Sequence, residues 1–159
     1  MRIIVLCMLL PVLLCGCTPK PETPAVTTAR PDRVEILCKA LLEAEGLPET
    51  TRCDLADTAA LYDISEDMLH NARVYRAAYA LDAFELAVFD AADAHAREEV
   101  EAKIQERLER LAQAYRGTSL GMYAQVRAAK VWVSGTVCAV IIAEDKTAAL
   151  LYDLCADVN

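Results

Sequence analysis

The chain has 159 residues, of which 24 are acidic and 16 are basic, so its net charge is −8. An acidic chain without clustered Lys and Arg argues against a nucleic-acid partner and against electrostatic attachment to anionic lipid. About 125 residues follow the N-terminal segment, which is enough for one domain with one hydrophobic core and too few for a two-lobed solute-binding protein.

The first 16 residues have the pattern of a secretory signal peptide. Arg2 provides a short positive region, and residues 3–14 form an apolar run. This run is too short to span a bilayer core, which needs about 20 apolar residues. We therefore expect residues 1–16 to be a signal peptide that is removed, rather than a membrane-spanning helix.

The apolar run ends in Leu14-Cys15-Gly16-Cys17, which resembles a bacterial lipobox. The resemblance implies cleavage before Cys17 and a diacylglycerol thioether on its sulfur, with a further palmitate-type chain on the new amine. Two or three acyl chains hold a protein durably, because each buried CH2 contributes about 0.8 kcal/mol. An ordinary secretory signal, or a membrane stub, with a coincidental cysteine is the alternative.

Residues 17–31 carry the expected lipidated cysteine and a tether rich in proline and threonine. Such a segment is extended, partly polyproline II, and spans at most roughly 3.1 Å per residue. A loop packed on the domain is the alternative. Removal of residues 1–16 deletes one base and no acid, leaving 15 basic against 24 acidic residues and a net charge of −9. The lipid rather than surface charge would therefore attach the protein to the membrane.

The exported part of the chain carries four further cysteines, Cys38, Cys53, Cys138 and Cys155. Of the three ways to pair them, we favour Cys38–Cys53 and Cys138–Cys155. A strand running back to Cys138 and a helix reaching Cys155 each cover about 15 Å. If the helix folds back over the strand, the two sulfurs lie at the same level along the strand axis. Each bond would add on the order of 3 kcal/mol. Four buried thiols are the alternative, and a zinc site is disfavoured because no Cys-x-x-Cys is present.

The domain, residues 32–159, begins with a helix that Asp32 caps, with Glu35 at the capping-box position. Its apolar side chains recur at helical spacing, and Gly46 and Pro48 end it. Asp54 caps a short helix to residue 60, and Ser65 caps a single turn to residue 70. The pattern then changes to alternation over residues 73–78 and 83–91, which predicts a hairpin with its loop at residues 79–82.

The longest predicted helix starts after Asp93 and covers residues 94–116, with a buried apolar stripe and charged residues on its other faces. A short helix over residues 122–129 follows. Residues 130–133 and 136–143 then predict a second hairpin around Ser134-Gly135. The second run is nearly continuous in apolar side chains, which is typical of a strand inside a sheet. Asp145 caps the last helix, to about residue 156, which we expect to pack through Ala149, Leu150, Tyr152 and Leu154.

This order of helix, hairpin, long helix, hairpin and helix predicts an α+β domain. We expect two layers, an antiparallel four-stranded sheet made of the two hairpins and helices packed on one of its faces.

Several stretches of the chain resemble the lipoprotein domain called domain of unknown function 4358, of Gram-positive, clostridia-like bacteria. The resemblance covers about residues 55–153. It rests on Tyr62-Asp63-Ile64-Ser65, Val74-Tyr75, residues 83–91, the long helix ending near Tyr115, and Val131-Trp132-Val133-Ser134-Gly135. It implies a lipid-anchored domain outside the cytoplasm and supplies no activity.

Glu85 is the polar residue that we single out in this pattern. It stands in an apolar strand, at a position that is often acidic in the resembling family. A contact with a partner or ligand is the functional interpretation. Strand alternation alone would also place it outward, as an ordinary solvated residue.

The sequence contains no recognisable catalytic constellation. His70 falls at a predicted turn and His95 in the first turn of the long helix, and neither has a Ser or Cys partner in a triad context. The acidic pairs Asp54/Asp57 and Asp63/Asp67 are explained by helix capping and solvation, although paired carboxylates can act in acid–base chemistry. Phosphate-loop and calcium-loop patterns are missing from the sequence. We therefore expect no metal and no cofactor.

The sequence thus predicts a non-enzymatic, lipid-anchored interaction module on the outer face of the cell membrane, with an envelope protein as the candidate partner. A small-ligand-binding accessory lipoprotein, with a pocket between sheet and helices, is the alternative. An enzyme that acts on envelope polymers is a more remote third.

Overall fold

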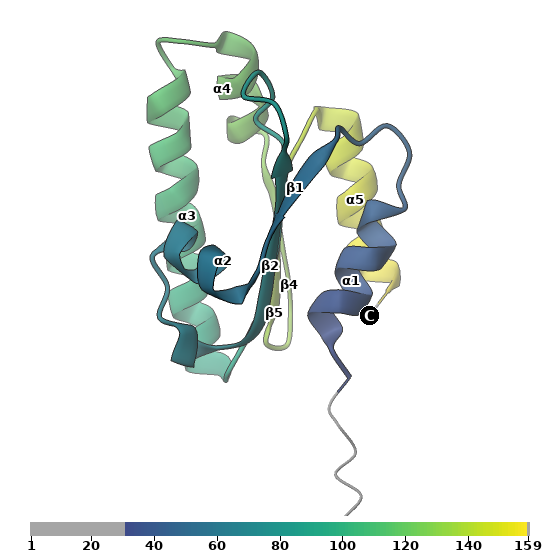
Figure 1. The fold of residues 1–159 in the computed structure, drawn as a ribbon, viewed down its shortest axis with the longest axis vertical. Coiled ribbons are helices and arrows are strands. Elements are labelled where there is room, and N and C mark those ends of the chain that lie inside the picture. Colours follow the sequence, from purple (N-terminus) through teal and green to yellow (C-terminus); the bar gives the residue numbers. More distant parts are fainter. Residues whose placement is uncertain (1–30, 159) are drawn as a thin grey trace, which may run out of the picture. The chain divides into compact units, whose positions relative to one another are not determined.

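A computed structural model describes residues 31–158 (Figure 1). The predicted signal peptide, Cys17 and the predicted tether before residue 31 lie outside the described residues. Eleven elements follow in chain order: α1 Arg33–Leu42, β1 Thr50–Cys53, α2 Leu55–Tyr62, the 3-10 turn η1 Glu66–Met68, β2 Leu69–Ala77, β3 Glu85–Ala91, α3 Ala94–Tyr115, α4 Leu120–Arg127, β4 Lys130–Ser134, β5 Val137–Ile142 and α5 Asp145–Asp157.

The helices begin where capping side chains satisfy their first backbone N–H groups. The carboxylates of Asp32, Asp54 and Asp93 accept from the backbone N–H three residues later, as predicted. Ser119 does the same for α4, which starts two residues earlier than expected. The prediction for α5 is wrong by one residue, because Glu144 is its N-cap and its side chain makes no capping bond.

The sheet has five antiparallel strands in the order β1-β2-β3-β5-β4, one more than predicted. The additional strand, β1, pairs with the end of β2, where Thr50 lies opposite Ala77 and Cys53 opposite Val74. It is a short edge strand of mostly polar residues, so its sequence has no apolar alternation to reveal it. β2 also begins earlier than expected and includes His70, so the predicted turn at this residue is wrong.

The second hairpin forms as predicted, with a shift of one residue in its turn. Ser134 still pairs with Val137, so the two residues of the turn are Gly135 and Thr136. Gly135 has φ of 60°, a left-handed conformation that glycine adopts without a steric penalty. β5 lies between β3 and β4, which confirms its place inside the sheet.

Helices cover both faces of the sheet, so the two-layer prediction is wrong. Figure 1 shows α2, α3 and α4 on one side, here called the α3 face, and α1 and α5 on the other, here called the α5 face. Each face has its own hydrophobic cluster. Every residue of β3 and β5 is buried. Strands buried on both faces are apolar at successive positions, as the nearly continuous apolar run of β5 is.

The packing residues predicted for α5 are also corrected. Its core side chains are Ala148, Leu151 and Cys155, at helical spacing. Ala149, Leu150 and Tyr152 are exposed instead, and Leu154 is partly buried against the cluster of the α5 face.

Candidate functional site

Glu85 lies at the start of β3 and points into the α3 face, beneath α2 and α3. Only 2% of its surface is exposed. Arg107 of α3 donates to both carboxylate oxygens, from Nε to Oε1 at 2.7 Å and from Nη2 to Oε2 at 2.5 Å. The hydroxyl of Tyr62 donates to Oε1 at 2.6 Å. Arg76, the cross-strand neighbour on β2, places its Nε 3.4 Å from Oε2.

Tyr62 and Arg107 also contact each other and the apolar core. The guanidinium carbon of Arg107 lies 4.9 Å from the centre of the Tyr62 ring, a cation–π arrangement. That ring meets Phe89 edge to face, with centroids 4.8 Å apart. Burial, and then the charge of Glu85, raise the pKa of Tyr62 well above its ordinary value, so its hydroxyl stays protonated as a donor.

The pKa of Arg107 reflects two opposing effects. Burial alone would lower the pKa of the guanidinium, but the hydrogen bonds and charge of Glu85 more than offset this, and the pKa lies above its ordinary value. The two residues therefore form a charged pair with bidentate geometry, the arrangement that makes charge-assisted hydrogen bonds strongest.

These contacts show that the outward-facing interpretation of Glu85 is wrong. Alternation places a residue outward only where one face of the strand meets water, and here both faces are covered. A contact between Glu85 and a partner stays a prediction, and it would require these ion pairs to open. The observed effect of the cluster is to join α2, α3, β2 and β3.

Arg107, which completes the cluster, was missed because the long helix is rich in exposed charge. The sequence carried one signal. Arg107 follows Ile104 by three residues and precedes Leu111 by four. It therefore interrupts the apolar stripe of α3 rather than lying on a polar face, and it is buried.

The four cysteines of residues 31–158 are thiols, and neither favoured disulfide is present. Cys53 and Cys138 contribute to the cluster of the α3 face, whereas Cys38 and Cys155 contribute to that of the α5 face. Each predicted pair therefore has one member on either side of the sheet. Two sulfurs at the same height along a strand still cannot bond when they point to opposite sides of it.

Burial also sets the chemistry of these thiols. It raises the pKa of Cys38 and Cys138 to about 12 and that of Cys155 to about 11. The pKa of Cys53 is raised for the same reason. Because the thiolate is the nucleophile and the metal ligand, these cysteines behave near neutral pH as small hydrophobic side chains, the alternative considered above.

The other titratable candidates are not brought together. His95 is exposed and lies 3.1 Å from Glu99, whereas His70 is exposed on β2. Asp54 caps α2 through the N–H of Asp57. Asp63 accepts from Lys103, whose hydrogen bond lowers the pKa of the carboxyl. Within residues 31–158, no three His, Cys, Asp or Glu side chains are grouped so that they could hold a metal ion.

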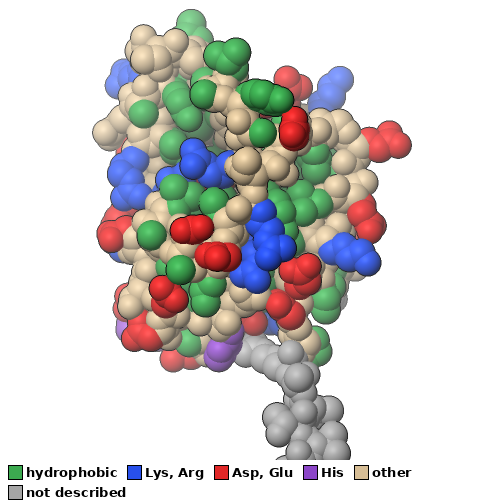
Figure 2. Space-filling model, in the orientation of Figure 1, with side chains coloured by type: hydrophobic (Ala, Val, Ile, Leu, Met, Phe, Trp, Pro, Cys, Tyr) green, Lys and Arg blue, Asp and Glu red, His purple; other side chains and the backbone are tan. Residues whose placement is uncertain are grey.

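An unusual apolar surface lies at one end of the domain. Residues 78–81, the first part of the connection from β2 to β3, read Ala-Tyr-Ala-Leu and are all exposed. Tyr79 is 67% exposed, Leu81 is 92% exposed, and Leu120 at the start of α4 is 79% exposed. The loop and the start of α4 lie at the same end of the molecule (Figure 1), where Figure 2 shows hydrophobic side chains at the surface. We call residues 78–81 with Leu120 the loop end.

A polar hollow of about 210 Å³ lies beside the loop end. Its lining includes the acidic residues Asp82 and Glu144 and the polar residue Gln125. No Lys or Arg is among the described residues that line it. The hollow therefore places negative charge next to exposed apolar side chains.

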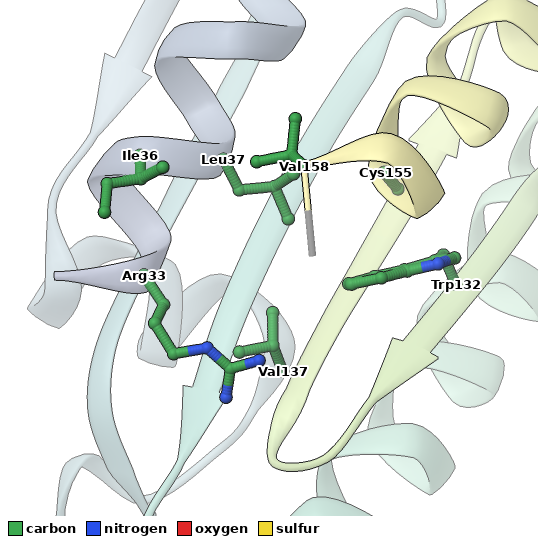
Figure 3. Close-up of a pocket in the computed structure, with 7 residues that line it drawn as sticks. All are labelled: Arg33, Ile36, Leu37, Trp132, Val137, Cys155 and Val158. Atoms are coloured by element: carbon green, nitrogen blue, oxygen red, sulfur yellow. The ribbon is translucent and has the colours of Figure 1, made fainter. Parts of the chain in front are cut away.

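A second, smaller pocket of about 110 Å³ lies on the α5 face. Figure 3 shows Leu37 of α1, Trp132 of β4 and Val158 after α5 around this pocket, with the Arg33 side chain nearby. Its volume is well below the roughly 300–1,000 Å³ of typical small-molecule sites. It can hold one small apolar group.

None of the described helices is both long and apolar enough to cross a membrane. A family model with the description Domain of unknown function (DUF4358) matches residues 43–143, which is more than half of the chain. The matched residues contain all five strands with α2, α3 and α4, whereas α1 and α5 lie outside. No curated protein and no solved structure matches the chain.

Proposed function

The chain belongs to the family described as domain of unknown function (DUF4358), and from this premise we propose that it is a lipid-anchored, extracytoplasmic lipoprotein. In this proposal it is a non-enzymatic interaction module that binds a protein partner at the cell envelope.

The anchor part of the proposal is supported by Leu14-Cys15-Gly16-Cys17 at the end of a short apolar run. A thiol directly after glycine is the acceptor that a lipobox requires, and the following Pro- and Thr-rich segment provides a spacer. A domain tethered in this way stays close to the membrane that holds its lipid anchor.

The binding part is carried by one observation, the loop end. Exposed loops of soluble domains are usually polar, yet here four consecutive residues are apolar and exposed. Contiguous exposed apolar surface marks sites of interaction with other proteins or with membranes. The buried Glu85 cluster instead supports a structural role, because its charged groups are already paired with one another.

The anchor is tested by metabolic labelling with an alkyne-bearing palmitate analogue. We expect label on the wild-type protein and on a Cys15→Ala control, and none on a Cys17→Ala variant, which should also leave the membrane fraction. Protease added to intact cells should digest the wild-type domain. Equal labelling of the Cys17→Ala protein, or protection from protease, would contradict the proposal.

The binding part is tested by crosslinking in intact cells, comparing the wild-type protein with the Cys17→Ala form. We expect one envelope protein to be captured only with the anchored form. A demonstrated substrate turnover that a single acidic substitution abolishes would show an enzyme instead.

The pocket beside Trp132 favours a second candidate, an accessory lipoprotein that binds a small ligand between sheet and helices. Trp132 is the single tryptophan of the chain, so its fluorescence reports occupancy of this pocket directly. Peptides and wall fragments that carry one small apolar group would be titrated against the wild-type protein and a Trp132→Phe control. A saturable fluorescence change together with a raised melting temperature would support this candidate, and a flat response would count against it.

A further inference from the structure

We infer that the loop end, with the acidic hollow beside it, is a docking surface for a protein that offers an apolar pocket next to a Lys or Arg side chain. The inference rests on the proposed function and names the chemistry of the partner. Leu81 and Tyr79 enter the partner's apolar pocket, and the partner's cationic side chain enters the hollow between Asp82 and Glu144.

The loop is held in one shape by hydrogen bonds on both sides. The backbone N–H of Ala78 donates to the carbonyl of Glu49 at 2.8 Å, and the Tyr79 hydroxyl donates to the Glu49 carboxylate at 3.2 Å. On the other side, the N–H of Ala83 donates to the side-chain oxygen of Gln125 in α4 at 3.3 Å. A loop that is already ordered loses little conformational entropy when it binds. Its exposed Tyr and Leu are therefore presented as anchors, not as mobile residues.

The negative charge of this surface favours a cationic protein partner over a second copy of the chain or an anionic lipid surface. The hollow beside the loop is lined by Asp82 and Glu144 without a described Lys or Arg, and Glu49 lies against the Tyr79 hydroxyl. A second copy of the chain would bring the same acidic groups together, and an anionic lipid surface would be repelled. A partner with a cationic side chain beside an apolar pocket satisfies both features, because complementary charge fixes register and raises the rate of encounter.

The loop end lies far from the start of α1. Asp32, where the chain enters the domain, hydrogen-bonds to Asn71 near the start of β2. The loop follows the far end of the same strand, about 20 Å away at roughly 3.3 Å per residue. Figure 1 shows the start of α1 and the β2–β3 loop at opposite ends of the domain. The loop end is thus at the end of the domain opposite to the start of α1.

The test is site-specific photocrosslinking with the full lipoprotein in its own cells. A benzophenone amino acid at position 120 leaves Leu81 and Tyr79 intact, and the same probe at position 150, which is half exposed on α5, is the control. We expect one discrete adduct from position 120, with a protein that mass spectrometry identifies and that is then purified. Its affinity for the lipoprotein should fall about tenfold or more with Leu81→Asp, as for an anchor residue, and be unchanged with Leu150→Asp.

The charge requirement is tested with the double variant Asp82→Asn and Glu144→Gln. The Asp82 carboxylate accepts from the N–H of Phe84 at 2.8 Å. The side-chain amide oxygen that Asp82→Asn introduces can still accept this hydrogen bond, so the loop keeps its shape. We expect weaker binding and a shallower dependence of affinity on salt. Unchanged melting temperatures of all variants would show that the domain still folds.

Other results would overturn the inference. An adduct with a second copy or with lipid, or an affinity that Leu81→Asp leaves unchanged, would refute it. An adduct from position 150 alone would refute this surface while the proposed interaction function stands. The absence of an adduct from both positions would count against the function as well.

Discussion

Removing either charge of the buried Glu85–Arg107 pair should destabilise the domain strongly. In Glu85→Gln, Arg107 keeps its charge at 7% exposure and loses its only described counter-ion within bonding distance. Breaking a buried pair in this way costs about 3–5 kcal/mol. In Arg107→Met, Glu85 retains its contacts with the Tyr62 hydroxyl and with the half-exposed Arg76. We therefore expect the free energy of unfolding to fall by about 3 kcal/mol, the lower end of this range.

The double variant Glu85→Gln/Arg107→Met should cost less than the sum of the two single variants, by about 2 kcal/mol or more, because no unpaired charge is left. Urea unfolding of residues 17–159 with Cys17→Ser, followed by Trp132 fluorescence, gives these free energies. Trp132 packs on the α5 face, away from the substituted residues, and so reports global unfolding. Additive costs would refute the reasoning.

The solvated pair of Asp63 and Lys103 is the matched control. The Lys103 Nζ lies 2.9 Å from a carboxylate oxygen of Asp63, which is hydrogen-bonding distance as in the buried pair, but both side chains reach solvent. Exposed pairs are screened by water and salt. A double-mutant cycle with Asp63→Asn and Lys103→Met should therefore give a coupling free energy of zero within experimental error. Equal coupling in the two cycles would mean that burial is not what makes the first pair strong.

Three further predictions follow from burial. The thiols of the folded domain should resist Ellman's reagent and react fully in urea. A molecular mass from mass spectrometry that corresponds to intact disulfides would contradict the structure. Because burial raises the pKa of Cys38 and Cys138 from 9.0 to about 12, the unfolded thiols ionise first as pH rises. The free energy of unfolding should therefore be constant up to about pH 9 and then fall by about 1.4 kcal/mol per pH unit for each such thiol; a level profile to pH 11 would refute this. Phe89→Ala should cost about 3–5 kcal/mol in urea unfolding, whereas Tyr79→Ala at the exposed loop should change stability by less than about 0.5 kcal/mol.

The limits of the family match correspond to the layers of the fold. The matched residues 43–143 contain the whole sheet and the helices of the α3 face. The helices of the α5 face, α1 and α5, flank the match at its two ends and pack against each other. The apolar side chains of β3 and β5 on that face, such as Leu86 and Ile141, are buried under them. The flanking helices therefore complete the burial of strands that lie within the match.

Much of the fold was predictable because its signals are local. Asp32, Asp54 and Asp93 each stand before a helix and bind its free N–H groups, so the starts of three helices follow from the sequence. The two hairpins follow from apolar runs separated by short loops, and the family resemblance is confirmed by the match. In each case the responsible contacts join residues close together in the chain, and propensity and spacing are sufficient.

The remaining features depend on which elements meet, and spacing along the chain does not specify that. β1 is a strand only because β2 offers it an unpaired edge. Glu85 is buried, and Cys138 and Cys155 are separated, because helices cover both faces of the sheet. Arg107 reaches Glu85 only once α3 lies across β3, a contact between residues 22 positions apart. The sequence by itself determined most of the elements and the capping of α1, α2 and α3. The tertiary structure decided which charges and thiols face one another, because burial and ion pairing depend on distance in space.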